Sequence, residues 1–196
     1  QTEIPIDGIG IYSDPEACDY CPSGSPYQTV TMHLVALMPS DLTGIARWEC
    51  RLYTRPDPLP AGLSIAIAGG GVNELAAPNF RVTLPSPLAW DQTVVLATFS
   101  TFYLGGEILM GLGPSEPSSV NDPASPAYTG ASPNSPWRRL TLATAGGLMS
   151  TPPGVWAAYA LNGGSWDCYH HLVMSPWCYP VPTEQQSWGA IKGLYR

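Results

Sequence analysis

The sequence predicts a mainly β protein: an antiparallel β-sandwich of the jelly-roll or immunoglobulin-like type, with about nine strands, long Pro- and Gly-rich loops and a short C-terminal helix. Two observations lead to this fold class. The chain of 196 residues contains 22 Pro and 20 Gly, which interrupt helices and form turns. Between them, short segments alternate apolar and polar side chains, as half-buried strands do.

The composition excludes several other classes. Charged residues make up only 12% of the chain, so it lacks the surplus of Ala, Glu, Lys and Leu that a helical bundle needs. The 7 Trp and 10 Tyr disfavour intrinsic disorder. With 8 basic against 15 acidic residues, nucleic acid is not an expected partner. The longest apolar stretch, residues 62–72, is too short and too glycine-rich to span a membrane.

The predicted strands follow one another with turn residues between them, at the spacing of an antiparallel sandwich. Residues 92–104 are apolar on both faces, which is typical of a central strand or of one whose second face is covered. The clearest strand segments are residues 28–38, 46–55, 63–68, 79–84, 92–104, 108–112, 137–143 and 155–161.

The strand at residues 46–55 has the most regular alternation. Trp48, Cys50 and Leu52 share one face and are expected to point inward. The inward position of Cys50 favours a buried disulfide over a reactive thiol. The opposite face carries a charged ladder, which we expect to face outward and to contact neighbouring copies through its arginines, Arg47, Arg51 and Arg55.

The N-terminal segment Thr2–Tyr12 is extended and rich in isoleucine. Two arrangements fit this pattern. The segment either completes its own sandwich, or it adds as a strand to the sheet edge of a neighbouring copy. Under the second alternative, the expected subunit contacts are Ile4, Ile6, Ile9 and Ile11.

Residues 113–136 contain six prolines, several serines and a single aliphatic residue, Val120. A stretch of this length without regular structure is either an extended loop packed on its domain or a linker between domains. Only about 60 residues follow it, too few for a second core. We therefore expect a single sandwich domain over residues 1–182, with 113–136 as an insertion or draped loop.

Residues 183–196 are predicted to form a short amphipathic helix. Thr183 is placed as an N-cap with Gln186 three residues later, which is a capping-box arrangement. Trp188 lies on the apolar face, and Lys192 and Arg196 lie in the last turn, where the helix dipole favours cations. This helix either caps its own domain or, through Trp188, Lys192 and Arg196, contacts another subunit.

The chain begins with Gln1 rather than Met, which we interpret as the product of signal-peptide cleavage; a trimmed chain is the alternative. In an exported protein, disulfides are the expected role of the five cysteines. Cys168 and Cys178 bracket a short aromatic loop, and Cys50 could pair with Cys18 or Cys21, leaving one cysteine free or joined to another chain. The spacing fits neither a zinc site nor a thioredoxin-type redox motif.

The sequence contains no motif typical of a catalytic site: no nucleophile elbow, phosphate loop, dinucleotide fingerprint or zinc-protease helix. His33, His170 and His171 have no third ligand at useful spacing, so we expect no metal and no cofactor. Paired carboxylates of a secreted hydrolase could still meet in space. Loop aromatics such as Trp166 and Trp177 could instead form a platform that stacks sugars.

Charge is unevenly distributed, because residues 1–46 contain six acidic residues and no Lys or Arg. An acidic head and a basic tail could dock between successive copies. A head-to-tail contact that does not close generates a filament. The leading hypothesis is therefore a secreted structural subunit that polymerises outside the cell or on its surface. A secreted adhesion or carbohydrate-binding sandwich is the alternative, and a hydrolase comes third.

Three short motifs resemble a group of uncharacterised exported proteins from environmental bacteria. They are the opening Ile9–Asp14 followed by a cysteine loop, the strand Gly44–Cys50, and the ending Ser187–Arg196. The strand order, residues 29–55 followed by 94–104, is also similar to the cohesin-type jelly-roll sandwich. The cysteines, the Pro-rich insertion and the closing helix depart from a cohesin, so dockerin binding is not implied. Neither resemblance supplies catalytic residues.

Overall fold

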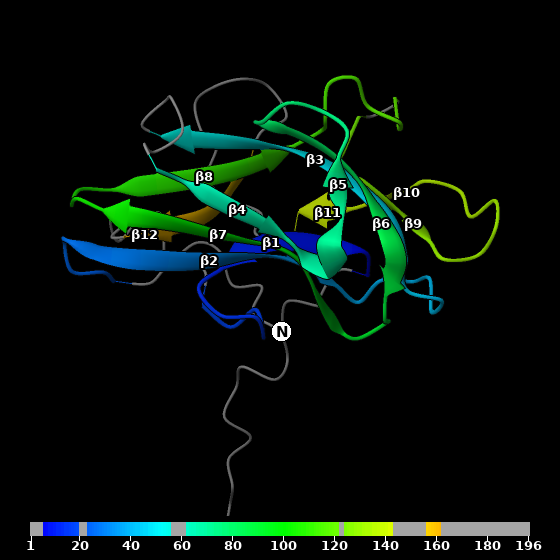
Figure 1. Cartoon of the computed structure of the whole chain (residues 1–196), viewed down its shortest axis with the longest axis horizontal. Helices are drawn as coiled ribbons and strands as arrows, with labels where there is room; N and C mark the ends of the chain where they lie inside the picture. Colours follow the sequence, from blue (N-terminus) through cyan, green and yellow to red (C-terminus); the bar gives the residue numbers. More distant parts are fainter. Residues whose placement is uncertain (1–5, 20–22, 56–61, 122–123, 143–155, 162–196) are drawn as a thin grey trace, which may run out of the picture.

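The computed structural model describes residues 6–19, 23–55, 62–121, 124–142 and 156–161, with the backbone alone for Arg55 and residues 156–160. These residues form twelve strands in two sheets, mostly antiparallel, in a β-sandwich-like arrangement (Figure 1). The only helical segment in this part of the chain is η1 (Ala68–Gly70), a single 3-10 turn. The predicted mainly β sandwich is confirmed at this level.

The first sheet has five strands in the order β11-β1-β2-β7-β4. Their bounds are Thr141–Leu142 for β11, Gly8–Tyr12 for β1, Gln28–Leu37 for β2, Thr93–Tyr103 for β7 and Ser64–Ile67 for β4. β2 and β7 pair along their whole length, with Gln28 opposite Tyr103 at one end and Leu37 opposite Thr93 at the other. This pair runs along the long axis of the molecule (Figure 1).

The second sheet has seven strands, with the order β10-β9-β3-β6-β5 and β8 and β12 joined beside β3. Their bounds are Arg138–Arg139 for β10, Ala127–Gly130 for β9, Ile45–Arg55 for β3, Asn79–Leu88 for β6, Val72–Asn73 for β5, Ile108–Gly113 for β8 and Trp156–Leu161 for β12. β6 pairs with one edge of β3, while β9 and β8 share the other edge, one beside each half of the strand.

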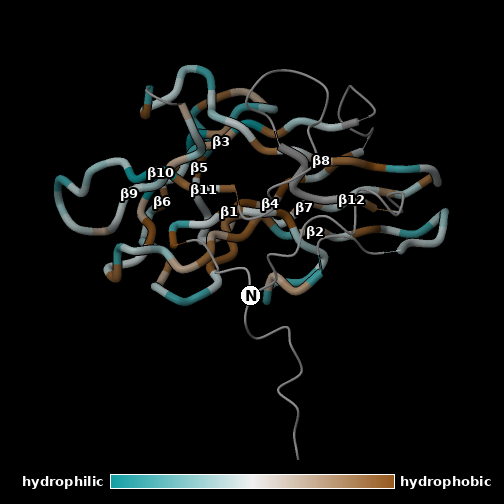
Figure 2. Tube along the Cα trace, turned by 180° about the vertical axis from the view of Figure 1, so that it is seen from behind, coloured by the Kyte–Doolittle hydropathy of each residue, from teal (hydrophilic) through white to brown (hydrophobic). Residues whose placement is uncertain are grey.

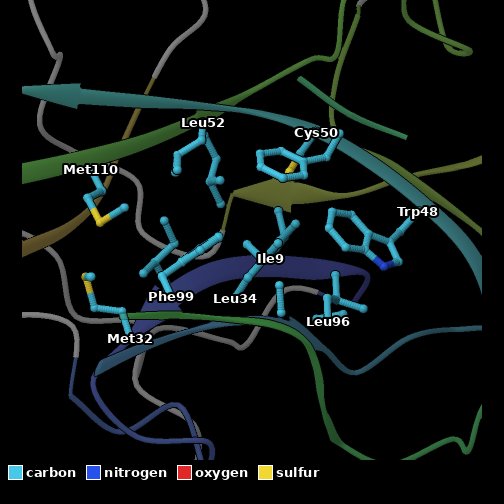
Figure 3. Packing of buried hydrophobic residues seen from close by; sticks show 14 of the residues in the cluster. Ile9, Met32, Leu34, Trp48, Cys50, Leu52, Leu96, Phe99 and Met110 are labelled. Carbon is cyan, nitrogen blue, oxygen red and sulfur yellow. The ribbon is translucent and has the colours of Figure 1, made fainter. Parts of the chain in front are cut away.

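The hydrophobic core lies between the two sheets. Ile9, Leu34 and Phe99 of the first sheet face Trp48 and Leu52 of the second (Figure 3). Each large side chain buried in this way contributes about 1.5–3 kcal/mol relative to an exposed one, so the alternating pattern fixes which face of each strand points inward. Hydrophobic residues accordingly lie mainly along the strands and hydrophilic ones mainly in the loops (Figure 2).

The N-terminal strand belongs to its own sandwich. β1 pairs antiparallel with β2 and parallel with β11 of the same chain. Ile9 and Ile11 are fully buried in the core, so the expectation that they contact a second copy is wrong. Ile6, just before β1, is 67% exposed and stays available for such a contact, whereas Ile4 lies outside the described residues.

The strands differ from the prediction in several places. β6 extends to Leu88, beyond the predicted segment 79–84, and β5 lies in no predicted strand. The single strand expected at residues 137–143 is two short strands, β10 and β11, which belong to different sheets because the chain crosses between them at the buried Leu140. β9 lies inside the segment expected to be a loop, residues 113–136. The predicted C-terminal helix, residues 183–196, lies outside the described part of the chain and stays a prediction.

Candidate functional site

The outer face of β3 is the first candidate site, because the sequence placed its charged ladder there. Trp48, Cys50 and Leu52 point into the core, as predicted, and Arg47 and Glu49 lie on the opposite face. This face is not open to solvent along its length, since Glu49 has no exposed surface. The segment that follows β8 covers it.

Glu49 fastens this covering segment to the sheet. Its Oε1 accepts hydrogen bonds from the backbone N–H of Ser119 (2.6 Å) and from the hydroxyl of Ser118 (3.3 Å). Its Oε2 accepts the Ser119 hydroxyl (2.7 Å) and the Nε–H of Arg81 (3.1 Å). Arg81 also donates to the backbone carbonyl of Pro117. A buried carboxylate with this many donors and a cationic partner is a structural anchor.

The two arginines of β3 whose side chains are described have partners within the chain. Nη2 of Arg47 lies 3.8 Å from Oε1 of Glu74. The Arg47 guanidinium also stacks over the Trp137 ring, 5.2 Å from the ring centroid. Arg51 forms an ion pair with Glu116 and stacks over its neighbour Tyr53. Their predicted contact with a second copy would have to compete with these pairs and stays a prediction.

Cys50 is a free thiol, which corrects the expectation of a buried disulfide at this position. The alternation of β3 turns it inward as predicted, but no other cysteine of the described residues lies against it. Burial raises the pKa of the Cys50 thiol, and the charge of the adjacent Glu49 raises it further. A thiol of this kind behaves as a small apolar side chain. Cys18 is disulfide-bonded.

A network of polar side chains joins the two sheets at one end of the sandwich. The Tyr128 hydroxyl of β9 donates to Oδ1 of Asp7 (2.6 Å) and accepts the backbone N–H of Asp41 (3.1 Å). Asp7 in turn accepts the backbone N–H of Ser40 (2.7 Å) and its hydroxyl (2.8 Å). Burial and the hydrogen bond to Asp7 raise the pKa of Tyr128. The hydroxyl is therefore held as a donor.

Asp41 is the second node of this network. Its Oδ1 accepts hydrogen bonds from the Thr43 hydroxyl (2.5 Å) and from the Thr43 backbone N–H (3.1 Å). Its Oδ2 accepts a hydrogen bond from the Ser135 hydroxyl (3.0 Å). Nε of Arg138 lies 3.6 Å from Oδ2 of Asp41. These hydrogen bonds, chiefly the one from the Thr43 side chain, lower the pKa of Asp41 despite partial burial. Two loops, residues 41–43 and 131–135, are thereby locked together.

Large apolar side chains are exposed at the opposite end of the β2–β7 pair. Phe102 is 53% exposed on the outer face of β7, and Leu104, two residues later, is 70% exposed. The β2–β7 register continues to Tyr27, which is 75% exposed and donates its backbone N–H to the Tyr103 carbonyl. We call Tyr27, Phe102 and Leu104 the Phe102 end.

A second group of exposed apolar side chains lies where β2 ends and β7 begins. Leu42 is 72% exposed in the loop after β2, and Ile6 is 67% exposed beside Asp7, whose carboxylate holds Ser40 of that loop. Trp90 is half-exposed and donates its indole N–H to the Pro39 carbonyl (2.8 Å). We call Ile6, Leu42 and Trp90 the Leu42 end.

Sequence reasoning missed most of both ends. Only Ile6 stood among the expected subunit contacts. The apolar pattern of residues 92–104 gave only a partial signal, because it placed Phe102 on the same face as Val94 and Leu96, which are buried. A shift in the β2–β7 register at Leu96 changes the alternation, and Phe102 lies on the outer face of β7. The sequence did not show that the Phe102 side chain stays exposed in the described structure.

Other predicted site residues lie outside the described part of the chain and stay predictions. They are Cys21, Cys168, Cys178, Ile4, Trp188, Lys192, Arg196, the side chain of Arg55 and the aromatic residues Trp166 and Trp177. Within the described residues, no group of three or more His, Cys, Asp or Glu side chains could hold a metal ion. The same residues include no helix long and apolar enough to cross a membrane.

Comparison with known proteins adds no relative to this description. No family model matches the chain, and neither a curated protein nor a solved structure matches it.

Proposed function

We propose that this chain is an extracellular structural subunit that binds copies of itself head to tail, with the Phe102 end of one copy against the Leu42 end of the next. The observation that supports this most directly is the placement of the large exposed apolar side chains. Six of the seven in the described structure belong to these two ends, and Val72 on β5 is the seventh.

The two ends lie far apart, at opposite ends of the β2–β7 strand pair. β2 has 10 residues, and at about 3.3 Å per residue it separates the ends by about 30 Å. Two different, distant patches on one molecule favour a heterologous contact over a two-fold one. A heterologous contact that does not close into a ring extends into a filament.

The expected strength of one contact is modest. Burying a large apolar side chain contributes about 1.5–3 kcal/mol. Three such side chains from each copy therefore contribute on the order of 10 kcal/mol to the contact. Bringing two molecules together costs about 4–15 kcal/mol. The balance is small, so the assembly should depend strongly on protein concentration.

The edges of the sheets favour end-to-end contact over edge-to-edge pairing. Of the edge strands in the described structure, β4, β5, β10 and β11 have only two to four residues, and β12, with six, is the longest. Strands this short offer few free backbone groups to a neighbour. β1 is already paired on both sides, so the proposed contact needs no exchange of strands.

The finer features expected from the sequence belong to this proposal as well. They are export from the cell, a sandwich of the jelly-roll or immunoglobulin-like type, further disulfides and a closing C-terminal helix. The low share of charged residues, 12%, suits a chain that buries much of its surface between copies.

The test is sedimentation velocity of the chain over a wide range of concentration. The variant carries Phe102→Ser and Leu104→Ser, and the matched control carries Val72→Ser, a side chain that is 67% exposed but belongs to neither end. We expect larger species to accumulate with concentration in the wild-type chain and the control but not in the variant. A wild-type chain that sediments as a monomer throughout would overturn the proposal.

A further inference from the structure

A small pocket opens on the outer surface of the second sheet, between β3 and the loop that joins β9 to β10. Its volume is about 290 Å³. The polar and aromatic side chains that line it are Arg47, Thr129, Ser132, Asn134, Ser135 and Trp137. A space of this size accommodates one small ring and little more.

The loop side of the pocket is rigid. The Ser135 hydroxyl accepts the backbone N–H of Gly130 (3.1 Å) and donates to Asp41. The backbone N–H of Ala131 donates to the Thr43 hydroxyl (2.9 Å), and that of Ser135 donates to the Ser132 carbonyl (3.0 Å). The walls are therefore formed before any ligand arrives, which lowers the entropic cost of binding.

The opposite side is formed by Trp137 and Arg47. The guanidinium of Arg47 is held by the Thr83 hydroxyl, which accepts from its Nε–H at 3.2 Å, and by Glu74. In this position it stacks over the Trp137 ring. A cation over an aromatic face stabilises the orientation of both groups, so the indole is fixed at the pocket wall.

Three polar side-chain groups of the pocket have no hydrogen-bond partner among the described residues: the Ser132 hydroxyl and the Asn134 amide, which are exposed, and the Trp137 indole N–H, which is partly buried. The amide and hydroxyl can both donate and accept, and the indole donates. The nearby charges are already paired, Arg47 with Glu74 and Asp41 with Arg138. The pocket therefore offers an aromatic ring and mixed donors and acceptors without an unpaired charge.

We propose that this pocket binds one residue of a neutral glycan. A sugar ring presents an apolar C–H face, which packs on an indole, and a rim of hydroxyls, each able to donate and accept hydrogen bonds. A phosphate or carboxylate ligand is disfavoured because Arg47, the cation among the described residues that line the pocket, already has a carboxylate partner. This inference is independent of the head-to-tail contact, although the pocket lies near the Leu42 end.

The test is an NMR titration of the tryptophan indole signals with neutral cello-, xylo- and chito-oligosaccharides, and with glucuronate and phosphate as charged probes. It is run on the chain with Phe102→Ser and Leu104→Ser, which leaves the pocket intact and removes the proposed assembly. We expect the Trp137 signal to move in a saturable way with at least one neutral glycan. Binding seen here supports the pocket whether or not the wild-type chain assembles.

Two kinds of variant check where the sugar binds. Trp137→Ala should weaken binding about tenfold or more, a loss of ~1.4 kcal/mol or more. Ser132→Ala and Asn134→Gly remove one free polar group each, and the glycine tolerates the positive φ of 66° at Asn134. The control, Thr98→Ala, alters a hydroxyl on the other sheet and should leave binding unchanged. No response to any neutral glycan, a stronger response to a charged probe, or binding that survives Trp137→Ala would overturn the proposal.

Discussion

At the scale of single residues, the alternation in the sequence predicts which side chains point inward but not what covers the outward ones. Glu49 shows the difference. Its place on the outer face of β3 was predicted correctly, yet it is completely buried under a segment more than 60 residues away in the chain. Long-range covering of this kind depends on tertiary packing, which leaves no local pattern in the sequence.

Replacing Glu49 by Gln should destabilise the protein by about 2–4 kcal/mol. The neutral amide would leave the Arg81 guanidinium without its anionic partner, and its NH2 group would face the hydrogen-bond donors of Ser119 and Arg81. The measurement is the free energy of unfolding in urea. The matched control is Glu116→Gln, whose side chain is 66% exposed in its ion pair with Arg51 and should cost less than about 1 kcal/mol. Equal losses for the two variants would show that Glu49 does not anchor the segment.

Asp41 should make the stability of the protein depend on pH. Its pKa is lower in the folded state than in the unfolded chain, chiefly through the hydrogen bond from Thr43. The stability that it contributes is therefore present above the ordinary carboxylate pKa and is lost as the pH falls through the lowered value. We expect the difference in unfolding free energy between wild type and Asp41→Asn to be largest at neutral pH and to shrink on acidification. A difference that stays constant would contradict this assignment.

At the scale of elements, the long strands were predictable and the short ones were not. β2, β3 and β7 each have ten or eleven residues, enough for an alternating pattern to be recognised. β9 has four residues between prolines and is held by Tyr128 and by backbone pairing with β3, so its sequence carries almost no strand signal. β10 and β11 were merged because the crossing at Leu140 has no turn residue to mark it.

Gly130 at the end of β9 tests how tightly these short elements are fitted. A Cβ atom at this position would lie 2.0 Å from Oδ2 of Asp41. Gly130→Ala should therefore displace Asp41 and destabilise the protein by about 1–3 kcal/mol. In an Asp41→Ala background the same change should cost much less, because the obstructing carboxylate is gone. The measurement is the free energy of unfolding of four proteins: wild type, Gly130→Ala, Asp41→Ala and the double variant. If the losses of the two single variants add up to that of the double variant, the proposed clash is refuted.

At the scale of the whole molecule, the sequence predicted the sandwich, but it did not predict which apolar side chains stay exposed at the two ends of the β2–β7 pair. Of the four isoleucines expected to contact another copy, Ile9 and Ile11 lie in the core, whereas Ile6 is exposed at the Leu42 end and its contact stays a prediction. The Phe102 end was recognised only as an apolar face of a strand. Which apolar face stays exposed depends on the packing of the entire chain, so the two-ended arrangement emerges only from the structure.

The central claim is the head-to-tail contact, and the most direct measurement mixes two variants in sedimentation velocity. One variant carries Phe102→Ser and Leu104→Ser, and the other carries Ile6→Ser and Leu42→Ser. Each keeps one intact end, so each alone should be a monomer, whereas an equal mixture should form a dimer that cannot grow further. A mixture that stays monomeric, or a single variant that dimerises by itself, would contradict the claim.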